Sequence, residues 1–330
     1  MREIDICVYF PFLEEINMPK VRIAMYHYVR DLKNSRYPEI KGLDYRLFQE
    51  QIEWMNRNFT FIKIEDVIAA YEGEVKLPEN AVLLTFDDGY IDNYTYCFPI
   101  LDKYKIQGTF YIPGKTFREH VLLDVNKIHF ILASVPIEKL LEDVVAEIEK
   151  NREEYNLESA ESLFQKYAIA NRFDSKEIIF VKRILQTVLP EDLRNKITSK
   201  LFEKYVGMPE NQFAKELYMN EEQILCMKNN GMHIGLHGYD HYWLGQLPIE
   251  QMKADIDKSI EAMRGIIDEN CWVFNYPYGS YNDDVVRHLQ KRGCKLSMTT
   301  EVRVADVDKD NRFLLPRLDC NDFPPKSDNY

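Results

Sequence analysis

Short apolar segments alternate with amphipathic stretches in two separate parts of this chain, and this alternation restricts the fold more than any other feature. In residues 20–117 the segments "VRIAMYHYV", "AVLLTF" and "GTFYIP" are separated by stretches of helical periodicity near 44–57 and 92–105. The same alternation returns in residues 223–320, with helices expected near 248–268 and 282–292. Strands this apolar expose neither face, as is typical of a parallel sheet covered by helices. The sequence therefore predicts an α/β fold.

The part of the chain between these two zones, residues 118–222, has no strand pattern. Apolar residues recur there at helical spacing in four segments, at 137–150, 160–170, 176–189 and 191–206. Neither β/α zone contains enough strands to form a sheet alone. We therefore predict one barrel-like domain over residues 1–330, interrupted by a helical insertion at 118–222. The insertion is expected to cover the substrate cleft, with binding of a partner protein as the alternative.

Composition restricts the partners of this protein. A net charge of −12 argues against nucleic acid or an anionic membrane as the main partner. No segment approaches the roughly 20 apolar residues of a membrane span. The N-terminal segment "MREIDICVYFPFLEEINMPK" carries acidic residues in its apolar run, unlike a signal peptide, and the six cysteines form no CxxC pair. We expect a cytoplasmic protein, with Met18 as a possible natural start; the sequence predicts no oligomeric state.

Polar residues stand where the expected strands end. His27 follows "VRIAMY", Asp87 and Asp88 follow "AVLLTF", His237 ends "MHIGLH", and "YPYG" at 276–279 follows "CWVFN" closely. The carboxyl ends of parallel strands meet at one edge of a sheet, where functional residues gather. We therefore expect these residues to lie close together.

The residue types at this edge suit a metal site. His237 and His241 are four residues apart, a spacing that lets two imidazoles on one side of a helical turn share a metal. An aspartate from a neighbouring strand would be the third ligand and would leave one position open, as in catalytic zinc sites. The adjacent aspartate could take a proton from water. Taken alone, "DDG" is commonly a turn and H-x3-H a surface pair, but their co-occurrence at strand ends favours the metal site.

Four segments together resemble the motifs of a known family. "LLTFDDGYIDNY" at 83–94, "GTFYIP" at 108–113, "HGYDH" at 237–241 and "YPYGSYN" at 276–282 are similar to the motifs of the polysaccharide deacetylase family, the NodB-type carbohydrate esterases. "MYHYV" resembles the subgroup whose motifs are permuted. The resemblance covers residues 20–117 and 223–318. It implies a distorted (β/α)7 barrel and metal-dependent hydrolysis of an N-acetyl group from an amino sugar or glycan precursor in surface-polysaccharide biosynthesis.

The resemblance also implies a role for each residue of the metal site. Asp88, His237 and His241 would bind a divalent metal, usually Zn²⁺. Asp87 would be the general base, and the backbone N–H of Tyr278 would help to stabilise the oxyanion.

The chain departs from the family pattern at three places. Gly238 stands where the family has Ser or Thr after the first histidine. The arginine of the third motif is absent, and Arg317 in "LLPRLD" is the candidate to orient Asp87 in its place. No late histidine motif supplies the general acid, so His27 is the candidate, with a structural role as its alternative and His288 as a poor substitute.

Aromatic side chains near these motifs could stack on a sugar, although some of them are expected to pack in the core; the candidates are Tyr239, Tyr242, Trp243 and Tyr281.

Two other functions stay open. The same residues could hydrolyse another C–N bond, such as a formamide or a cyclic imide. The chain could also be a glycan-binding module without catalytic activity.

Overall fold

The computed structural model describes residues 20–330, and the expectations for the N-terminal segment, including a start at Met18, lie outside them. Within this range a nine-stranded sheet contains eight mutually parallel strands, and seven of them follow one another side by side. They are β1 (Lys20–Tyr26), β5 (Ala81–Phe86), β6 (Gly108–Ile112), β7 (His233–Leu236), β8 (Phe274–Asn275), β9 (Ser297–Met298) and β11 (Leu318–Asp319). β5 is buried along its whole length, as its apolar sequence predicts.

The segment 315–319 joins the two sides of this sheet. Leu315 forms a parallel bridge with Met298 of β9, and Leu318 and Asp319 pair in parallel with β1. The sheet therefore curls into a distorted barrel of seven parallel strands, which confirms the predicted fold class. Four short strands lie outside this set: β4 (Thr60–Phe61) on β5, β10 (Ala305–Asp306) on β1, and β2 (Val29–Arg30) with β3 (Leu43–Asp44).

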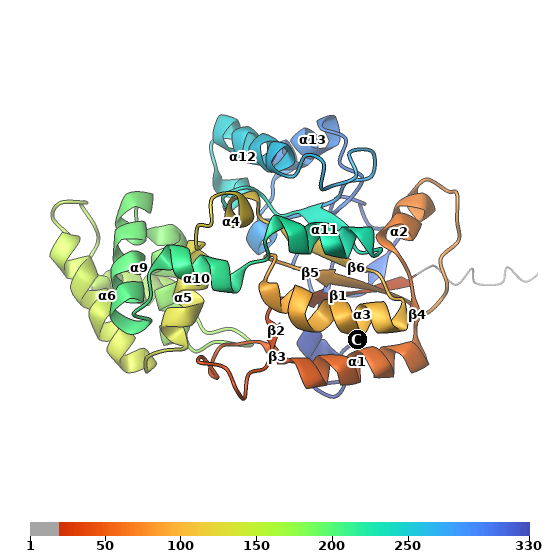
Figure 1. The fold of residues 1–330 in the computed structure, drawn as a ribbon. Coiled ribbons are helices and arrows are strands. Elements are labelled where there is room, and N and C mark those ends of the chain that lie inside the picture. Colours follow the sequence, from red (N-terminus) through yellow and green to blue (C-terminus); the bar gives the residue numbers. More distant parts are fainter. Residues whose placement is uncertain (1–19) are drawn as a thin grey trace, which may run out of the picture.

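Helices surround the barrel (Figure 1), and those predicted near 44–57, 92–105, 248–268 and 282–292 are among them, whereas the helices at 64–71 and 114–118 were not predicted. They are α1 (Tyr45–Asn58), α2 (Ile64–Tyr71), α3 (Phe98–Tyr104), α4 (Gly114–Arg118), α11 (Glu221–Asn229), α12 (Ile249–Ala262) and α13 (Asp283–Lys291). The Asp44 side chain caps α1 by accepting the backbone N–H of Arg46. α12 is shorter than predicted, because the chain turns at Gly265, whose φ is 78°.

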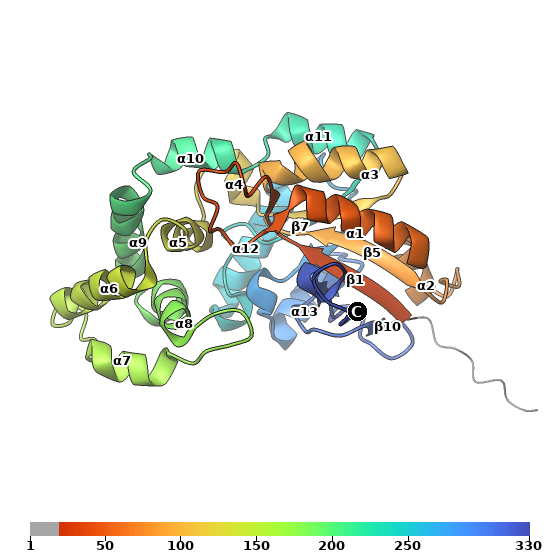
Figure 2. The same ribbon diagram turned by 90° about the horizontal axis from the view of Figure 1, so that it is seen from below.

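Six further helices form a separate lobe on one side of the barrel, and both ribbon views show it (Figures 1 and 2). They are α5 (Asp124–Leu132), α6 (Ile137–Asn151), α7 (Ala160–Tyr167), α8 (Lys176–Arg183), α9 (Glu191–Tyr205) and α10 (Glu210–Leu217). We call residues 124–217 the helical lobe. Its four predicted helical segments are present, but α5 and α10 were not predicted. Most of α5 is buried, so its sequence lacks the polar face that marks an amphipathic helix.

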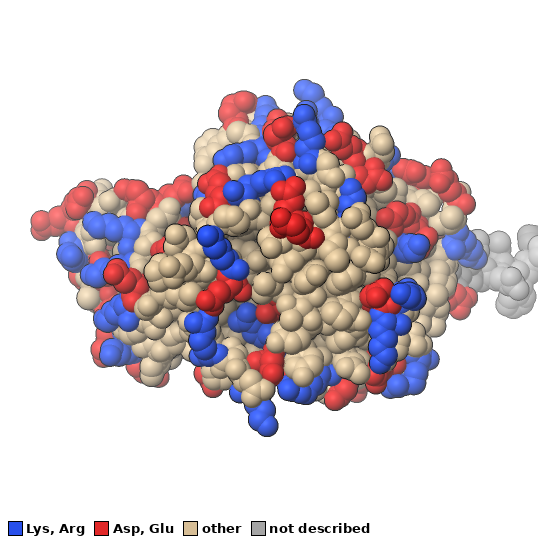
Figure 3. All heavy atoms as spheres, viewed as in Figure 1, with Lys and Arg blue, Asp and Glu red and all other residues tan. Residues whose placement is uncertain are grey.

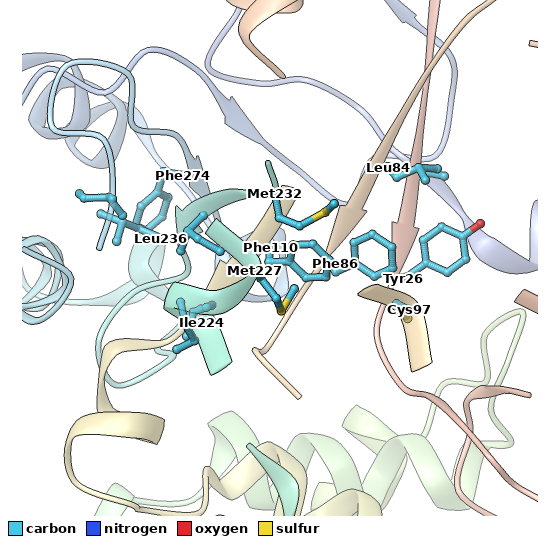
Figure 4. Packing of buried hydrophobic residues seen from close by; sticks show 14 of the residues in the cluster. Tyr26, Leu84, Phe86, Cys97, Phe110, Ile224, Met227, Met232, Leu236 and Phe274 are labelled. Atoms are coloured by element: carbon cyan, nitrogen blue, oxygen red, sulfur yellow. The ribbon is translucent and has the colours of Figure 1, made fainter. Parts of the chain in front are cut away.

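The barrel and the helical lobe have different hydrophobic clusters. In the barrel, the rings of Tyr26, Phe86 and Phe110 stack across β1, β5 and β6 with centroids 5.1 and 4.5 Å apart (Figure 4). The cluster of the helical lobe extends to Tyr28 and Tyr90, which follow β1 and β5. The lobe therefore packs directly on the carboxyl ends of these strands.

The surface carries both signs of charge. On the face seen in Figure 3, basic and acidic side chains alternate over the barrel and the helical lobe, and no continuous basic area covers either. Among residues 20–330, no helix has the length and apolar character needed to cross a membrane. The five cysteines in this range are free.

Candidate metal centre

Three side chains from two strand ends converge on one point. Oδ1 of Asp88, after β5, lies 3.4 Å from Nε2 of His237 and 3.2 Å from Nε2 of His241, both after β7. The two Nε2 atoms are 3.2 Å apart. All three side chains are buried. The structure thus brings together the three residues predicted as ligands.

The spacing of these atoms fits a metal ion. Four ligands about 2.1 Å from a tetrahedral zinc ion lie roughly 3.4 Å from one another, close to the separations seen here. Asp88 Oδ1 is buried without a hydrogen-bond donor among the described residues, which is costly unless a cation is present. Nδ1 of His237 contacts the carbonyl oxygen of Asn275 at 2.7 Å. This contact places a proton on Nδ1 and leaves the Nε2 lone pair for a metal.

The backbone at this site is held in an unusual conformation. Asp88, His241 and Tyr278 have φ angles of 70°, 58° and 58°, in the left-handed region that side chains other than glycine rarely adopt. Such residues cost about 1–3 kcal/mol each and cluster at functional sites. Three strained residues around one point therefore mark this edge of the barrel as a site and not as an ordinary set of turns.

The loop between the two histidines corrects one expectation. Residues 237–241 form no helical turn, because Gly238 has a φ of 71° and His241 is also left-handed. Asp255 of α12 holds the loop by accepting the backbone N–H groups of Tyr239 and Asp240 at 3.0 and 2.8 Å. A Cβ atom at Gly238 would lie 3.0 Å from Asp255, in addition to the strained φ. This explains why glycine replaces the Ser or Thr of the family motif.

Asp87 lies beside the metal cluster and is held by Arg317. The guanidinium donates to both carboxylate oxygens at 2.8 Å, and it also donates to the carbonyl of Thr299 at 3.0 Å. Arg317 is fully buried. His27 Nε2 lies 3.6 Å from Asp87 Oδ2, and the His27 side chain is 42% exposed. The structure therefore places Arg317 against Asp87 and leaves His27 open to a substrate.

The electrostatic environment keeps Asp87 ionised. Burial raises the pKa of this carboxyl, but the charge of Arg317, followed by that of His27, outweighs burial and holds the pKa below its ordinary value. Asp87 is therefore a proton acceptor with a fixed orientation, as a general base requires.

A buried hydrogen-bond chain connects the metal cluster to the helical lobe. The Tyr90 hydroxyl donates to Asp88 Oδ2 at 2.5 Å, and Asn126 of α5 donates to Tyr90 and Tyr28 at 2.7 and 2.9 Å. The Tyr218 hydroxyl donates to the side-chain oxygen of Asn126. Burial, followed by the charge of Asp88, raises the pKa of Tyr90 well above its usual value, so this hydroxyl keeps its proton. The chain thus fixes the orientation of the Asp88 carboxylate.

A cavity of about 290 Å³ opens onto these residues. The barrel contributes the three predicted ligands together with His27, Asp87, Tyr278 and Arg317, and the helical lobe contributes Val125, His129, Asn171, Asp174, Ile179, Lys182, Arg183 and Gln186. The helical lobe therefore forms one wall of this cavity, and its role as a cover over the substrate cleft stays a prediction.

Some predicted residues do not reach this cavity. His288 contacts Asp257 at 2.8 Å on the outer helices and does not line it. Of the four aromatic candidates, only Trp243 lines the cavity, and its ring stacks on Tyr278 at 4.4 Å. Tyr239 is buried and donates to Glu119 instead.

Sequence reasoning missed the supporting residues Tyr28, Tyr90, Asn126, Tyr218 and Asp255. Tyr28 and Tyr90 stand next to quoted motifs, so their positions beside "YH" and "DDG" were an available signal. Asn126 and Asp255 lie inside helices, and no local pattern distinguishes them from other polar residues.

The sequence matches the model of one family, the polysaccharide deacetylases, over residues 74–157 and 190–297. This match enters the helical region that the motifs left uncovered. YxkH of Bacillus subtilis (strain 168), named as a polysaccharide deacetylase, is 20% identical over 291 residues, which are 88% of this chain and 68% of that protein. The poly-beta-1,6-N-acetyl-D-glucosamine N-deacetylase of Escherichia coli (strain K12) is 34% identical over 86 residues, 26% of this chain and 12% of that protein.

Solved structures share the fold. The deacetylase PplD of Streptococcus pyogenes, in complex with acetate, has a TM-score of 0.57 at 18% identity and covers 94% of this chain and 96% of its own. IcaB from Ammonifex degensii has a TM-score of 0.51 at 18% identity, with 91% of each chain covered.

Proposed function

This chain belongs to the polysaccharide deacetylase family, and from that membership and the geometry of its metal cluster we propose that it hydrolyses the N-acetyl group of an amino sugar. The observation that carries the proposal is the convergence of Asp88, His237 and His241 beside an ionised Asp87. This arrangement provides both a set of metal ligands and a proton acceptor at the end of one cavity.

We assign Zn²⁺ as the metal, because two imidazole nitrogens and one carboxylate oxygen form a ligand set that zinc accepts in catalytic sites. Bound there, the metal supplies Lewis-acid chemistry, polarising an amide carbonyl and lowering the pKa of a water molecule. The residues of this chain supply the remaining functions.

Asp87 is the proposed general base, since Arg317 fixes its two oxygens and Oδ2 faces His27. Asp87 Oδ2 accepts the proton of the attacking water. The Tyr278 backbone N–H, held in its strained turn, is the proposed donor to the developing oxyanion. His27 Nε2, the most exposed of these groups, donates a proton to the departing amine nitrogen.

The function is tested by acetate release. Wild-type protein with one equivalent of Zn²⁺ should release acetate from at least one member of a panel of N-acetyl amino sugars, including glucosamine, galactosamine and their oligomers. N-formyl amino sugars and cyclic imides form the comparison set. If these compounds are turned over faster than every N-acetyl sugar, the protein is a hydrolase of another C–N bond and not a deacetylase. If no compound is turned over, the result favours a glycan-binding module.

The hydrogen-bond chain to Asp88 gives a second expectation. Tyr90→Phe should weaken Zn²⁺ binding by about 10–100-fold, as is typical for partners of metal ligands, and Asn126→Leu should weaken it by about tenfold, the lower end of that range. The measurement is competition with a chromophoric chelator, which does not depend on activity. Asn151→Leu is the control, because Asn151 is also buried in the helical lobe but bonds only within α6. Equal affinities for all variants would exclude this positioning role.

The family implies an acetylated glycan as substrate. We propose that the substrate is a precursor in surface-polysaccharide assembly; the cytoplasmic location expected from the sequence stays a prediction.

A further inference from the structure

A second cavity lies next to the one that contains the metal cluster. It has a volume of about 540 Å³, and His129, Asp174 and Lys182 line both cavities. The two cavities are therefore adjacent, and these three side chains lie between them. The end of α5, the start of α6 and α8 line the second cavity together with residues 39–41 of the barrel. Figure 2 shows where these three helices lie in the helical lobe.

The lining of this second cavity is largely aliphatic. No Phe, Tyr or Trp side chain lines it, and the His129 imidazole is the one aromatic ring in its lining, so it offers little surface on which a nucleobase could stack. The lining includes a set of aliphatic side chains: Ile40, Leu132, Ala133, Val135, Ile137 and Ile178. Cavities of this size and character bind small apolar groups.

Positive charge gathers where the two cavities meet. Lys182 donates to Asp174 at 2.7 Å, and Lys41 bonds to the same carboxylate. Arg183, which lines the first cavity, has its guanidinium 5.3 Å from the Trp243 ring and forms no ion pair among residues 20–330. Lys182 lines both cavities, whereas Lys41 lines only the second and Arg183 only the first. Asp174 pairs with both lysines, so Arg183 is the cation here that has no carboxylate partner among residues 20–330.

We propose that the substrate is an N-acetyl amino sugar linked through an anionic group to an aliphatic chain. This inference rests on the proposed function and specifies its substrate class. The sugar occupies the first cavity with its amide at the metal cluster, the anionic linker lies near Lys182 and Arg183, and the chain enters the second cavity. Such an amphiphile presents a sugar to the first cavity, an anionic group to Lys182 and Arg183, and an aliphatic chain to the second cavity.

The test is a calorimetric titration of the full chain with butyl, hexyl, octyl and decyl phosphate, each kept below its micelle concentration. Every methylene that enters the cavity should tighten binding by about three- to fourfold, until the cavity is filled. Inorganic phosphate should bind weakly, since it reaches only the junction. Naphthyl phosphate, which is apolar but aromatic, should bind more weakly than octyl phosphate.

Two variants locate the binding. Ile178→Asp should remove the dependence of affinity on alkyl chain length. Ala133→Phe fills part of the cavity without burying a charge, so the gain in affinity should stop at a shorter alkyl chain than in the wild type. Val145→Asp is the matched control, because Val145 is a partly buried aliphatic residue of the same lobe that lies outside this cavity. Equal affinity for butyl and decyl phosphate, or a chain-length dependence that both cavity variants retain, would overturn the inference.

The titration does not involve hydrolysis. Failure of acetate release with a normal chain-length dependence would therefore contradict the proposed function alone. Acetate release from unmodified N-acetyl sugars without any chain-length dependence would contradict this inference alone.

Discussion

Replacing Asp87 with asparagine is expected to lower kcat for acetate release by about two to four orders of magnitude, the usual contribution of a general base, while the bound metal stays in place. Asparagine keeps the size of the side chain but does not accept the proton from water. The metal should remain because Asp87 contributes no atom to the Asp88, His237 and His241 cluster. Acetate release and metal content are measured on the same sample.

The control is Asp92→Asn. Asp92 is also buried and also binds an arginine through both oxygens, with Arg30 donating at 2.8 and 3.1 Å. Removing one partner of such a pair costs about 3–5 kcal/mol, so both variants should lose stability to a similar degree. Only Asp87→Asn should lose kcat. If Asp87→Asn loses its metal and Asp88→Asn keeps it, the two aspartates have the reverse roles.

Replacing His237 or His241 with alanine is expected to weaken Zn²⁺ binding by more than about 100-fold. Loss of a residue that only hydrogen-bonds to a ligand costs up to about 100-fold, and loss of a ligand itself should cost more. Each histidine contributes one of three ligand atoms that lie within 3.4 Å of one another, and two remaining ligands do not hold the ion tightly against water. Binding is measured by chelator competition, and acetate release should fall in parallel.

His233→Ala is the matched control for these variants. His233 is the first residue of β7, the strand that His237 follows, and it is also buried, but its ring contacts Glu65 at 2.7 Å, away from the cavity. Its replacement should leave the affinity for Zn²⁺ unchanged. Comparable losses in all three variants would mean that the barrel, and not a set of ligands, had been damaged.

The site residues that the sequence could predict are those that directly follow a strand. His27, Asp87, Asp88 and His237 each follow an apolar segment that becomes a parallel strand, and the carboxyl ends of such strands meet at one edge. The predicted barrel and the convergence of these residues follow from that rule. Arg317 was found only through its resemblance to a family motif, since its contact with Asp87 spans 230 residues of sequence.

The remaining features depend on contacts that no local pattern records. The non-helical loop after His237 depends on Asp255, sixteen residues from Tyr239. The orientation of Asp88 depends on Asn126, in a helix whose buried sequence hides its periodicity. The aliphatic cavity exists because separate helices of the lobe leave space between them, and helical spacing within one segment does not predict such a space.

The measurement that tests the central claim most directly is acetate release by metal-free protein during a titration with Zn²⁺. The account predicts no release without metal, a rate that rises in proportion to added Zn²⁺, and a plateau at one equivalent per chain. The plateau should be absent in His237→Ala and present in His233→Ala. Undiminished release by the metal-free protein, or an identical titration curve for His237→Ala, would contradict the assignment of Asp88, His237 and His241 as the catalytic metal site.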